Sequence, residues 1–226
     1  MVGVLPSERQ TFPSADALGV PTVAAEDFEP SYLIPHRQKI RTDRPVAGGA
    51  VHFFLGDERF EPVWKTPKKG LSYVKSVGAA LTPDFSLYPE MPLSLQLFNV
   101  YRNRWCGAFW QSRGVRVIPT VGWSDESSYS FCFLGIEEGS AVAVSTVGLG
   151  DPRGTRGATQ DERALFRAGF DEMLRRIRPR QVLLYGESYD GLLPEGTDES
   201  LLRSYPSRWS SIREERRRLS EEAMRA

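Results

Sequence analysis

Short apolar runs recur along the middle of the chain, and most of them are rich in β-branched or aromatic residues. Such runs, which lack a regular polar alternation, predict strands that are buried on both faces, as parallel strands are. The five runs are Val51–Leu55, Val77–Leu81, Val115–Val121, Ala141–Val147 and Val182–Tyr185. A further segment, Ser128–Leu134, alternates polar and aromatic residues and predicts an additional edge strand.

Two longer segments between these runs carry the spacing of amphipathic helices. The first begins at Pro92, which suits the first helical position because its missing N–H costs nothing there, and it ends at Gly114. The second opens with Thr159-Gln160-Asp161-Glu162, a capping-box pattern, and stops before Pro179. The connection over residues 61–76 is less regular, because two prolines and a glycine interrupt it.

Strands that alternate with helices predict βαβ units and a mostly parallel sheet. We therefore expect an α/β fold in which about five parallel strands carry helices on both faces. Five strands are few for a closed eight-stranded barrel, which usually needs about 250 residues. A degenerate, incomplete barrel of the TIM type is therefore the alternative.

The two ends of the chain differ from this middle part in amino-acid composition and in hydrophobic pattern. Residues 1–47 are rich in proline and polar residues, and they predict an irregular N-terminal arm in front of an α/β core over residues 48–190. Within the arm, Tyr32-Leu33-Ile34 is either a short strand or a hydrophobic contact with the core. Residues 191–226 contain a loop and then a highly charged segment, 208–225, that predicts a helix. That helix is either a solvated tail or a docking helix for a protein partner.

Composition argues against several classes of protein. The 226 residues contain 29 Lys and Arg and 29 Asp and Glu, and a neutral total does not fit a dedicated nucleic-acid coat or a polybasic membrane binder. No run approaches the roughly 20 apolar residues that span a bilayer, and the first residues lack a signal-peptide pattern. We expect a cytoplasmic protein in which Cys106 and Cys132 are buried free thiols.

An acidic residue follows every predicted strand within a few positions. These residues are Asp57 with Glu58, Asp84, Asp125, Asp151 and Glu187. In parallel α/β sheets, ligands bind beyond the carboxyl ends of the strands. The acids are therefore either turn and helix caps, or a cluster that binds Mg²⁺ or acts as an acid–base pair. Asp57 and Asp84 are the leading catalytic pair, because their strands are consecutive and their loops are short.

Residues near this pair supply hydrogen-bond donors and aromatic surface. Tyr88 lies on the loop after Asp84, and Asn99 and Arg102 share a helix face that can clamp an anion. Trp123 follows a strand end and is a candidate for stacking on a planar ligand. The alternatives are that the helix face is only solvated and that the tryptophan packs under its loop.

Two further features bear on cofactors. The glycine-rich segment 148–157 lies between a strand and a helix, where such loops contact phosphate, but its spacing matches neither the Walker loop nor the dinucleotide fingerprint. It is either a phosphate-binding loop or a flexible polar loop. The only histidines, His36 and His52, lack metal-ligand spacing, so the sequence provides no zinc site and no Ser-His-Asp arrangement.

Motifs around these residues resemble a known family. They are Val51-His52-Phe53-Phe54-Leu55 with Asp57 and Phe60, Thr82–Tyr88, Met91-Pro92, Asn99–Arg102, Trp110-Gln111, Val117–Val121 and Tyr185-Gly186. Over about residues 50–186 the chain is similar to the uncharacterised family called domain of unknown function 4417, which occurs in bacteria, phages and other mobile elements. The resemblance implies a phage- or mobile-element-like setting and implies no particular reaction.

Two functional hypotheses follow. In the first, the six residues Asp57, Asp84, Tyr88, Asn99, Arg102 and Trp123 line a ligand-binding or catalytic pocket at the carboxyl edge of the sheet. Its ligand would be a phosphorylated small molecule or a nucleic-acid end, with Mg²⁺ as a candidate cofactor. In the second, the protein is a non-catalytic interaction module, and the same residues are caps and core contacts.

Overall fold

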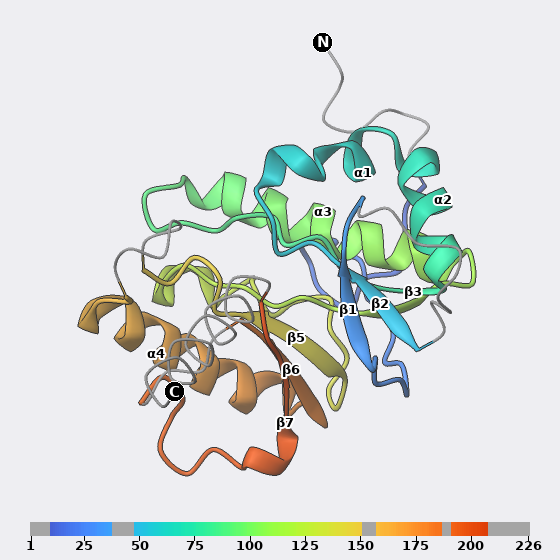
Figure 1. Cartoon of the computed structure of the whole chain (residues 1–226). Coiled ribbons are helices and arrows are strands. Elements are labelled where there is room, and N and C mark those ends of the chain that lie inside the picture. Colours follow the sequence, from blue (N-terminus) through green and yellow to red (C-terminus); the bar gives the residue numbers. More distant parts are fainter. Residues whose placement is uncertain (1–9, 38–47, 151–156, 187–190, 208–226) are drawn as a thin grey trace, which may run out of the picture.

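The computed structural model describes residues 10–37, 48–150, 157–186 and 191–207, in which strands and helices alternate (Figure 1). The strands are β1 Tyr32–Pro35, β2 Gly49–His52, β3 Ala79–Leu81, β4 Arg116–Ile118, β5 Ala141–Ser145, β6 Gln181–Tyr185 and β7 Leu202–Tyr205. The helices are α1 Glu61–Lys65, α2 Pro67–Val77, α3 Leu93–Gln111 and α4 Gln160–Ile177. Short 3-10 helices are η1 Asp57–Arg59, η2 Glu126–Ser128 and η3 Glu199–Leu201.

Strands pair in the order in which they occur in the chain, and all of these pairs are parallel. One sheet has the order β1-β2-β3-β4 and the other has the order β5-β6-β7. A parallel bridge between Thr120 and Ala143 joins the two sheets at their neighbouring edges, where the Val121 amide donates to the Ala143 carbonyl at 2.8 Å. The α/β class and the parallel pairing predicted from the sequence are confirmed.

The helices pack on one face of this strand layer. Val51 and Val117 lie on that face in a core cluster with side chains of α1, α2 and α3, and Val142 and Leu184 lie in a second cluster with α4. The opposite face carries a third cluster, to which no helix of the described structure contributes. That inner cluster contains Phe28, Ala50, Phe54, Ala79, Leu81, Ile118, Ala141, Ala143, Leu183, Tyr185 and Tyr205.

This arrangement differs from the expected sheet with helices on both faces. The inner face needs no helices because the strand layer curves around it, and four alanines leave room for the larger side chains. Tyr205 of β7 donates a hydrogen bond to the carbonyl of Pro30, just before β1, so the two ends of the layer meet there. Sequential strand order and this inner core agree with the incomplete barrel, the alternative prediction.

Two strands lie outside the predicted α/β core. β1 belongs to the expected irregular arm and β7 to the expected C-terminal loop, which raises the strand count in the described structure from five to seven. The predicted edge strand Ser128–Leu134 is instead a series of turns, because its amides bond locally, for example from Phe131 to the Ser128 carbonyl at 3.1 Å. The charged segment 208–225 lies outside the described residues.

The two helices with clear sequence signals form where they were expected. Pro92 is the N-cap of α3, and α4 begins with the predicted capping box, in which Thr159 Oγ1 accepts from the Glu162 amide at 3.2 Å. Both cysteines are buried and free, as predicted, and burial raises the pKa of Cys132 to about 12. Among the described helices, none has the length and apolarity needed to cross a membrane.

Candidate functional site

A cavity of about 280 Å³ opens beyond the carboxyl ends of β3, β4 and β5, and we call it the edge cavity. Its walls come from the loops after β3 and β4, the end of β5 with the residues after it, and the first turns of α4. The polar lining residues are Asp84, Ser86, Tyr88, Ser124, Ser145 and Glu162. Trp123, Phe166 and several Val and Leu side chains supply most of the rest. Parallel α/β proteins bind ligands at this edge of the sheet.

Asp84 stands three residues after the end of β3, on a backbone that is firmly held. The Thr120 amide donates to Thr82 Oγ1 at 2.7 Å, and Thr120 Oγ1 donates back to the Thr82 carbonyl at 2.8 Å. Asn103 Nδ2 donates to the Pro83 carbonyl at 2.7 Å. The Asp84 side chain itself is half-buried, and no donor in the described structure bonds to its carboxyl group.

The environment of Asp84 changes its acidity. Burial, and in second place the negative charge of Asp57, raises the pKa of Asp84 from 3.8 to about 7. A carboxyl group with this pKa is divided between its protonated and ionised forms at neutral pH, so it can either donate or accept a proton. Half-buried carboxyl groups with strongly shifted pKa values are enriched at functional sites.

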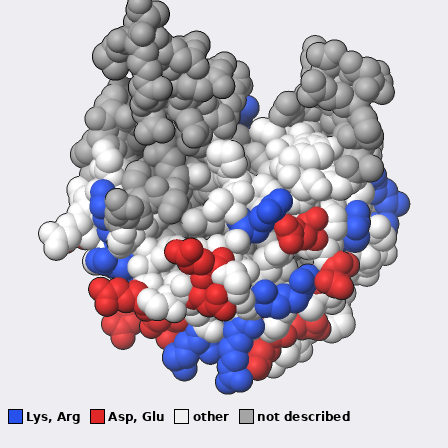
Figure 2. All heavy atoms as spheres, turned by 60° about the horizontal axis from the view of Figure 1, so that its bottom comes forward, with Lys and Arg blue, Asp and Glu red and all other residues white. Residues whose placement is uncertain are grey.

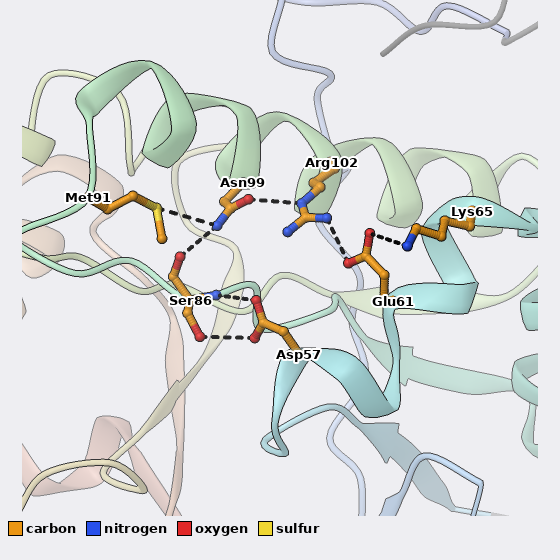
Figure 3. A network of polar contacts seen from close by, with 7 residues as sticks. All are labelled: Asp57, Glu61, Lys65, Ser86, Met91, Asn99 and Arg102. Atoms are coloured by element: carbon orange, nitrogen blue, oxygen red, sulfur yellow. Dashed lines mark hydrogen bonds and ion pairs between the residues drawn. The ribbon is translucent and has the colours of Figure 1, made fainter. Parts of the chain in front are cut away.

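Asp57 lies in η1 and belongs to a polar network beside the cavity (Figure 3). Its carboxylate accepts a hydrogen bond from Ser86 Oγ at 2.9 Å and another from the Ser86 amide at 3.2 Å. Asn99 Nδ2 donates to the Ser86 carbonyl at 2.7 Å, so the backbone of this residue is held from two sides. The network fixes the loop that carries Asp84.

Arg102 completes this network on the side away from Ser86 (Figure 3). Its Nε donates to Asn99 Oδ1 at 2.9 Å, and its Nη1 forms an ion pair with Glu61 at 2.8 Å. The guanidinium also lies over the ring of Phe85, 3.7 Å from its centroid. Arg102 is therefore engaged within the protein and is not part of the cavity lining.

Trp123 forms an aromatic wall of the edge cavity. Its ring lies 5.4 Å from the ring of Phe166 on α4, between centroids. A Cβ atom at Gly169 would lie only 2.2 Å from Trp123 Nε1, so the indole packs directly on the backbone of α4 where a side chain is missing. This contact fixes the orientation of the indole ring.

The structure thus divides the six residues predicted from the sequence into two groups. Asp84, Tyr88 and Trp123 meet in the lining of the edge cavity. The other three, Asp57, Asn99 and Arg102, form the adjoining network through Ser86. Tyr88 connects the groups, because its exposed hydroxyl donates to Ser86 Oγ at 3.2 Å.

Sequence reasoning missed four polar lining residues, Ser86, Ser124, Ser145 and Glu162. Ser124 lies three residues after the predicted strand Val115–Val121, so a search of that window for hydroxyl groups as well as carboxylates would have found it. Ser145 is the last residue of β5 and lies inside the predicted strand Ala141–Val147, so the same search would have missed it. Glu162 was recognised only as a capping residue. Its Oε2 does accept from the Thr159 amide at 2.7 Å, but the same side chain also lines the cavity.

A buried cation lies beneath the loop that carries Asp84. The Arg104 guanidinium donates to the carbonyls of Thr120, Cys132 and Leu134 at 2.8, 2.9 and 2.9 Å, and burial lowers its pKa to about 10. A void of about 10 Å³ is lined by both Arg104 and Asp84. Nothing in the sequence pattern distinguished this arginine from a solvated one.

The structure describes both histidines and part of the glycine-rich segment, the features that bear on cofactors. Gly148 and Leu149 line the edge cavity, whereas residues 151–156 of the glycine-rich segment lie outside the described structure. No group of three or more His, Cys, Asp or Glu side chains in the described ranges is arranged to hold a metal ion. His36 and His52 are buried, and burial is the main cause that lowers their pKa values to about 4 and about 3.

Fold and site together define a parallel α/β protein with a cavity at the carboxyl edge of its strands, lined by the Asp84 carboxyl group, to which no described residue donates a hydrogen bond. The chain belongs to the family described as Domain of unknown function (DUF4417), which it matches over residues 12–199. The matched segment is longer than the stretch of about 50–186 that carries the motifs, and it includes β1.

Two phage proteins are similar to almost the whole chain. The Gene 1 protein of Mycobacterium phage D29 is 44% identical over 211 residues, which are 92% of this chain and 73% of that protein. The Gene 1 protein of Mycobacterium phage L5 is 44% identical over 209 residues, which are 91% of this chain and 86% of that protein. No solved structure matches the chain.

Proposed function

We propose that the edge cavity binds a small polar ligand and that Asp84 is its acid–base group. The observation that supports this most directly is the half-buried Asp84 carboxyl, which lines the cavity and accepts no hydrogen bond from the described structure. A polar group that loses water without gaining a partner costs roughly 1–3 kcal/mol of folding free energy. A ligand that supplies the partner would offset that cost.

Apolar surface supports the same location. Of the seven large hydrophobic side chains that are exposed in the described structure, Tyr88, Val147 and Leu165 line the edge cavity. Leu93 and Leu95 are also exposed, and they follow the loop that carries Asp84 and Tyr88. Exposed apolar groups that surround a few polar ones are typical of ligand sites. A separate interaction module would instead favour an apolar patch on another face.

The distribution of charge on one face of the molecule argues against long nucleic acids as ligands. The face shown in Figure 2 carries Lys and Arg beside Asp and Glu, without a broad area of one sign. Arg178 pairs with Glu138 at 2.9 Å, and Arg203 pairs with Glu29 at 3.1 Å. Basic residues that are paired in this way do not form the positive surface that long nucleic acids require.

Asp84 can serve a ligand in two ways at neutral pH. Its protonated form donates a hydrogen bond, and its ionised form accepts one or removes a proton from a bound group. Trp123 and Phe166 exclude water from one side of the cavity, which strengthens any polar contact made inside. Asp57 acts on this chemistry from outside the lining, because its charge helps to keep Asp84 protonated.

The proposal is tested by thermal shift with a panel of sugars, amino acids, nucleosides, nucleotides and sugar phosphates. A ligand at 100 times its dissociation constant adds about 2.7 kcal/mol of stability. We expect at least one compound to stabilise the wild type and Asp198→Asn, a control that removes an exposed charge at the N-cap of η3, but not Asp84→Asn. If no compound acts, or if Asp84→Asn responds as the wild type does, the proposal fails.

A further inference from the structure

The charged side chains in the described lining of the edge cavity are both acidic. They are Asp84 and Glu162, and no Lys or Arg is among the described lining residues. The N-terminus of α4 would attract an anion, but the carboxylate of Glu162 already bonds to the Thr159 amide there. A phosphoryl group would therefore meet charge of its own sign, and the lining favours a neutral or cationic ligand.

Three of the four hydroxyl groups in the lining, those of Ser86, Tyr88 and Ser124, donate their protons to the protein, and the fourth, Ser145 Oγ, accepts from the Val147 amide at 3.0 Å. Ser86 Oγ donates to the Asp57 carboxylate at 2.9 Å, and Ser124 Oγ donates to Gln96 Oε1 at 2.7 Å. The assignment at Ser124 follows from Gln96, whose Nε2 donates to the carbonyl groups of Tyr88 and Met91 and whose Oε1 must accept. These hydroxyls offer a ligand lone pairs, as ionised Asp84 also does. The cavity is thus rich in acceptors and suits a ligand rich in donors.

Apolar walls set the shape of the ligand. The ring of Trp123 is held in one orientation against Gly169 and Phe166, and it forms an aromatic part of the cavity lining. Flat ligands stack on aromatic side chains, because every base has a π face. The cavity volume of about 280 Å³ lies just below the usual range for drug-sized ligands, so the ligand is a single small ring system.

Charge, hydrogen bonding and shape point to one class of ligand. We propose that the edge cavity recognises a planar heterocycle that carries N–H donors and no phosphate group, in the class of nucleobases and nucleosides, an inference that rests on the proposed function. Asp84 accepts N–H groups from one edge of the ring, and Trp123 stacks on its face. The sequence had suggested a phosphorylated ligand, and the acidic, acceptor-rich lining argues against that choice.

Matched pairs of ligands test this class. Calorimetric titration of the full chain at pH 7.5 would use the bases and nucleosides of adenine, guanine, cytosine and uracil, each beside its 5′-monophosphate. We expect at least one base or nucleoside to bind saturably, with its monophosphate at least 10-fold weaker. Asp84→Asn should weaken that binding by at least 10-fold, because the amide replaces one of the two acceptor oxygens with an NH2 donor and carries no negative charge, while Asp198→Asn should leave it unchanged. Thermal melting of each variant confirms that it is folded.

The other outcomes separate the ligand class from the site. If the monophosphate binds more tightly than its nucleoside and Asp84→Asn weakens it, the ligand class is wrong and the site stands. If no base or nucleoside binds but another compound of the thermal-shift panel acts through Asp84, the ligand class is again wrong and the site stands. If nothing in either experiment depends on Asp84, both proposals are overturned.

Discussion

Replacing Asp84 by asparagine should change how the stability of the protein depends on pH. In the unfolded chain this carboxyl loses its proton near its ordinary pKa of 3.8, but in the folded protein it keeps the proton until about pH 7. Between these values the folded state binds the extra proton. The free energy of unfolding must therefore decrease as the pH rises from about 4 to about 7, and it stays at the lower level above that. Asparagine does not titrate, so the variant lacks this decrease.

The size of the effect follows from the shift. Three pKa units at about 1.36 kcal/mol each correspond to roughly 4 kcal/mol for a group that is fully shielded from water. Asp84 is half-buried and faces a cavity, so solvent reduces that amount. We expect the free energy of unfolding of Asp84→Asn, minus that of the wild type, to increase by about 2–4 kcal/mol between pH 4 and pH 8.

Urea unfolding at intervals of one pH unit measures this difference directly. Histidines and other carboxyl groups titrate in both proteins, and their contributions cancel when the two curves are subtracted. Asp198→Asn is the matched control, because hydrogen bonds from Ser200 lower the pKa of Asp198, so that any slope has the opposite sign. A difference curve for Asp84→Asn that is flat within about 0.5 kcal/mol would refute the assignment of a raised pKa and with it the acid–base role.

Three further changes test other parts of the structure. Gly169→Ala places a Cβ atom 2.2 Å from Trp123 Nε1, so it should cost about 1–3 kcal/mol and alter the near-ultraviolet circular dichroism; an unchanged spectrum contradicts the packing. Arg104→Met removes the donors to three buried carbonyl groups and should lower the free energy of unfolding by about 3 kcal/mol or more in urea; a loss below about 1 kcal/mol contradicts their burial. Burial lowers the pKa of His52 to about 3, so the folded state binds fewer protons than the unfolded state below pH 6.5. The free energy of unfolding therefore decreases as the pH is lowered below 6.5. His52→Gln should lack this loss, which is about 2 kcal/mol between pH 7 and pH 5; equal slopes for the variant and the wild type would contradict it.

The sequence pattern predicted the helices and strands correctly where each element depends on residues that are close together in the chain. The run Ala141–Val147 contains β5, and the capping box at Thr159 marks the start of α4, because both depend on residues close together in the chain. β7 was not predicted because it has only four residues and one of these is buried, so it leaves no apolar run, whereas Tyr32–Ile34 of β1 was one of two alternatives for that segment. Which face of the sheet the helices cover depends on the curvature of the whole strand layer, and a short stretch of sequence does not determine that curvature.

The location of the site could be predicted from the sequence better than the roles of its residues. The rule that ligands bind beyond the carboxyl ends of parallel strands led to the loops after β3 and β4, where Asp84, Tyr88 and Trp123 line the edge cavity. The same rule could not distinguish Asp84 from Asp57, because the difference depends on Ser86, which is 29 residues away from Asp57 in the chain. Partners at that separation are decided by the folded backbone.

Contrast between these two acids gives the strongest physical reason to regard Asp84 as functional. Asp57 has two donors from Ser86, and its bonds secure a loop, so folding alone explains its place in the structure. Asp84 has no donor in the described part of the chain, and its burial weakens the folded state at neutral pH. An asparagine or a serine would occupy the position at lower cost. A carboxyl group kept at such a cost, in a cavity at the edge where α/β proteins bind ligands, is best explained by a ligand that supplies what the protein does not.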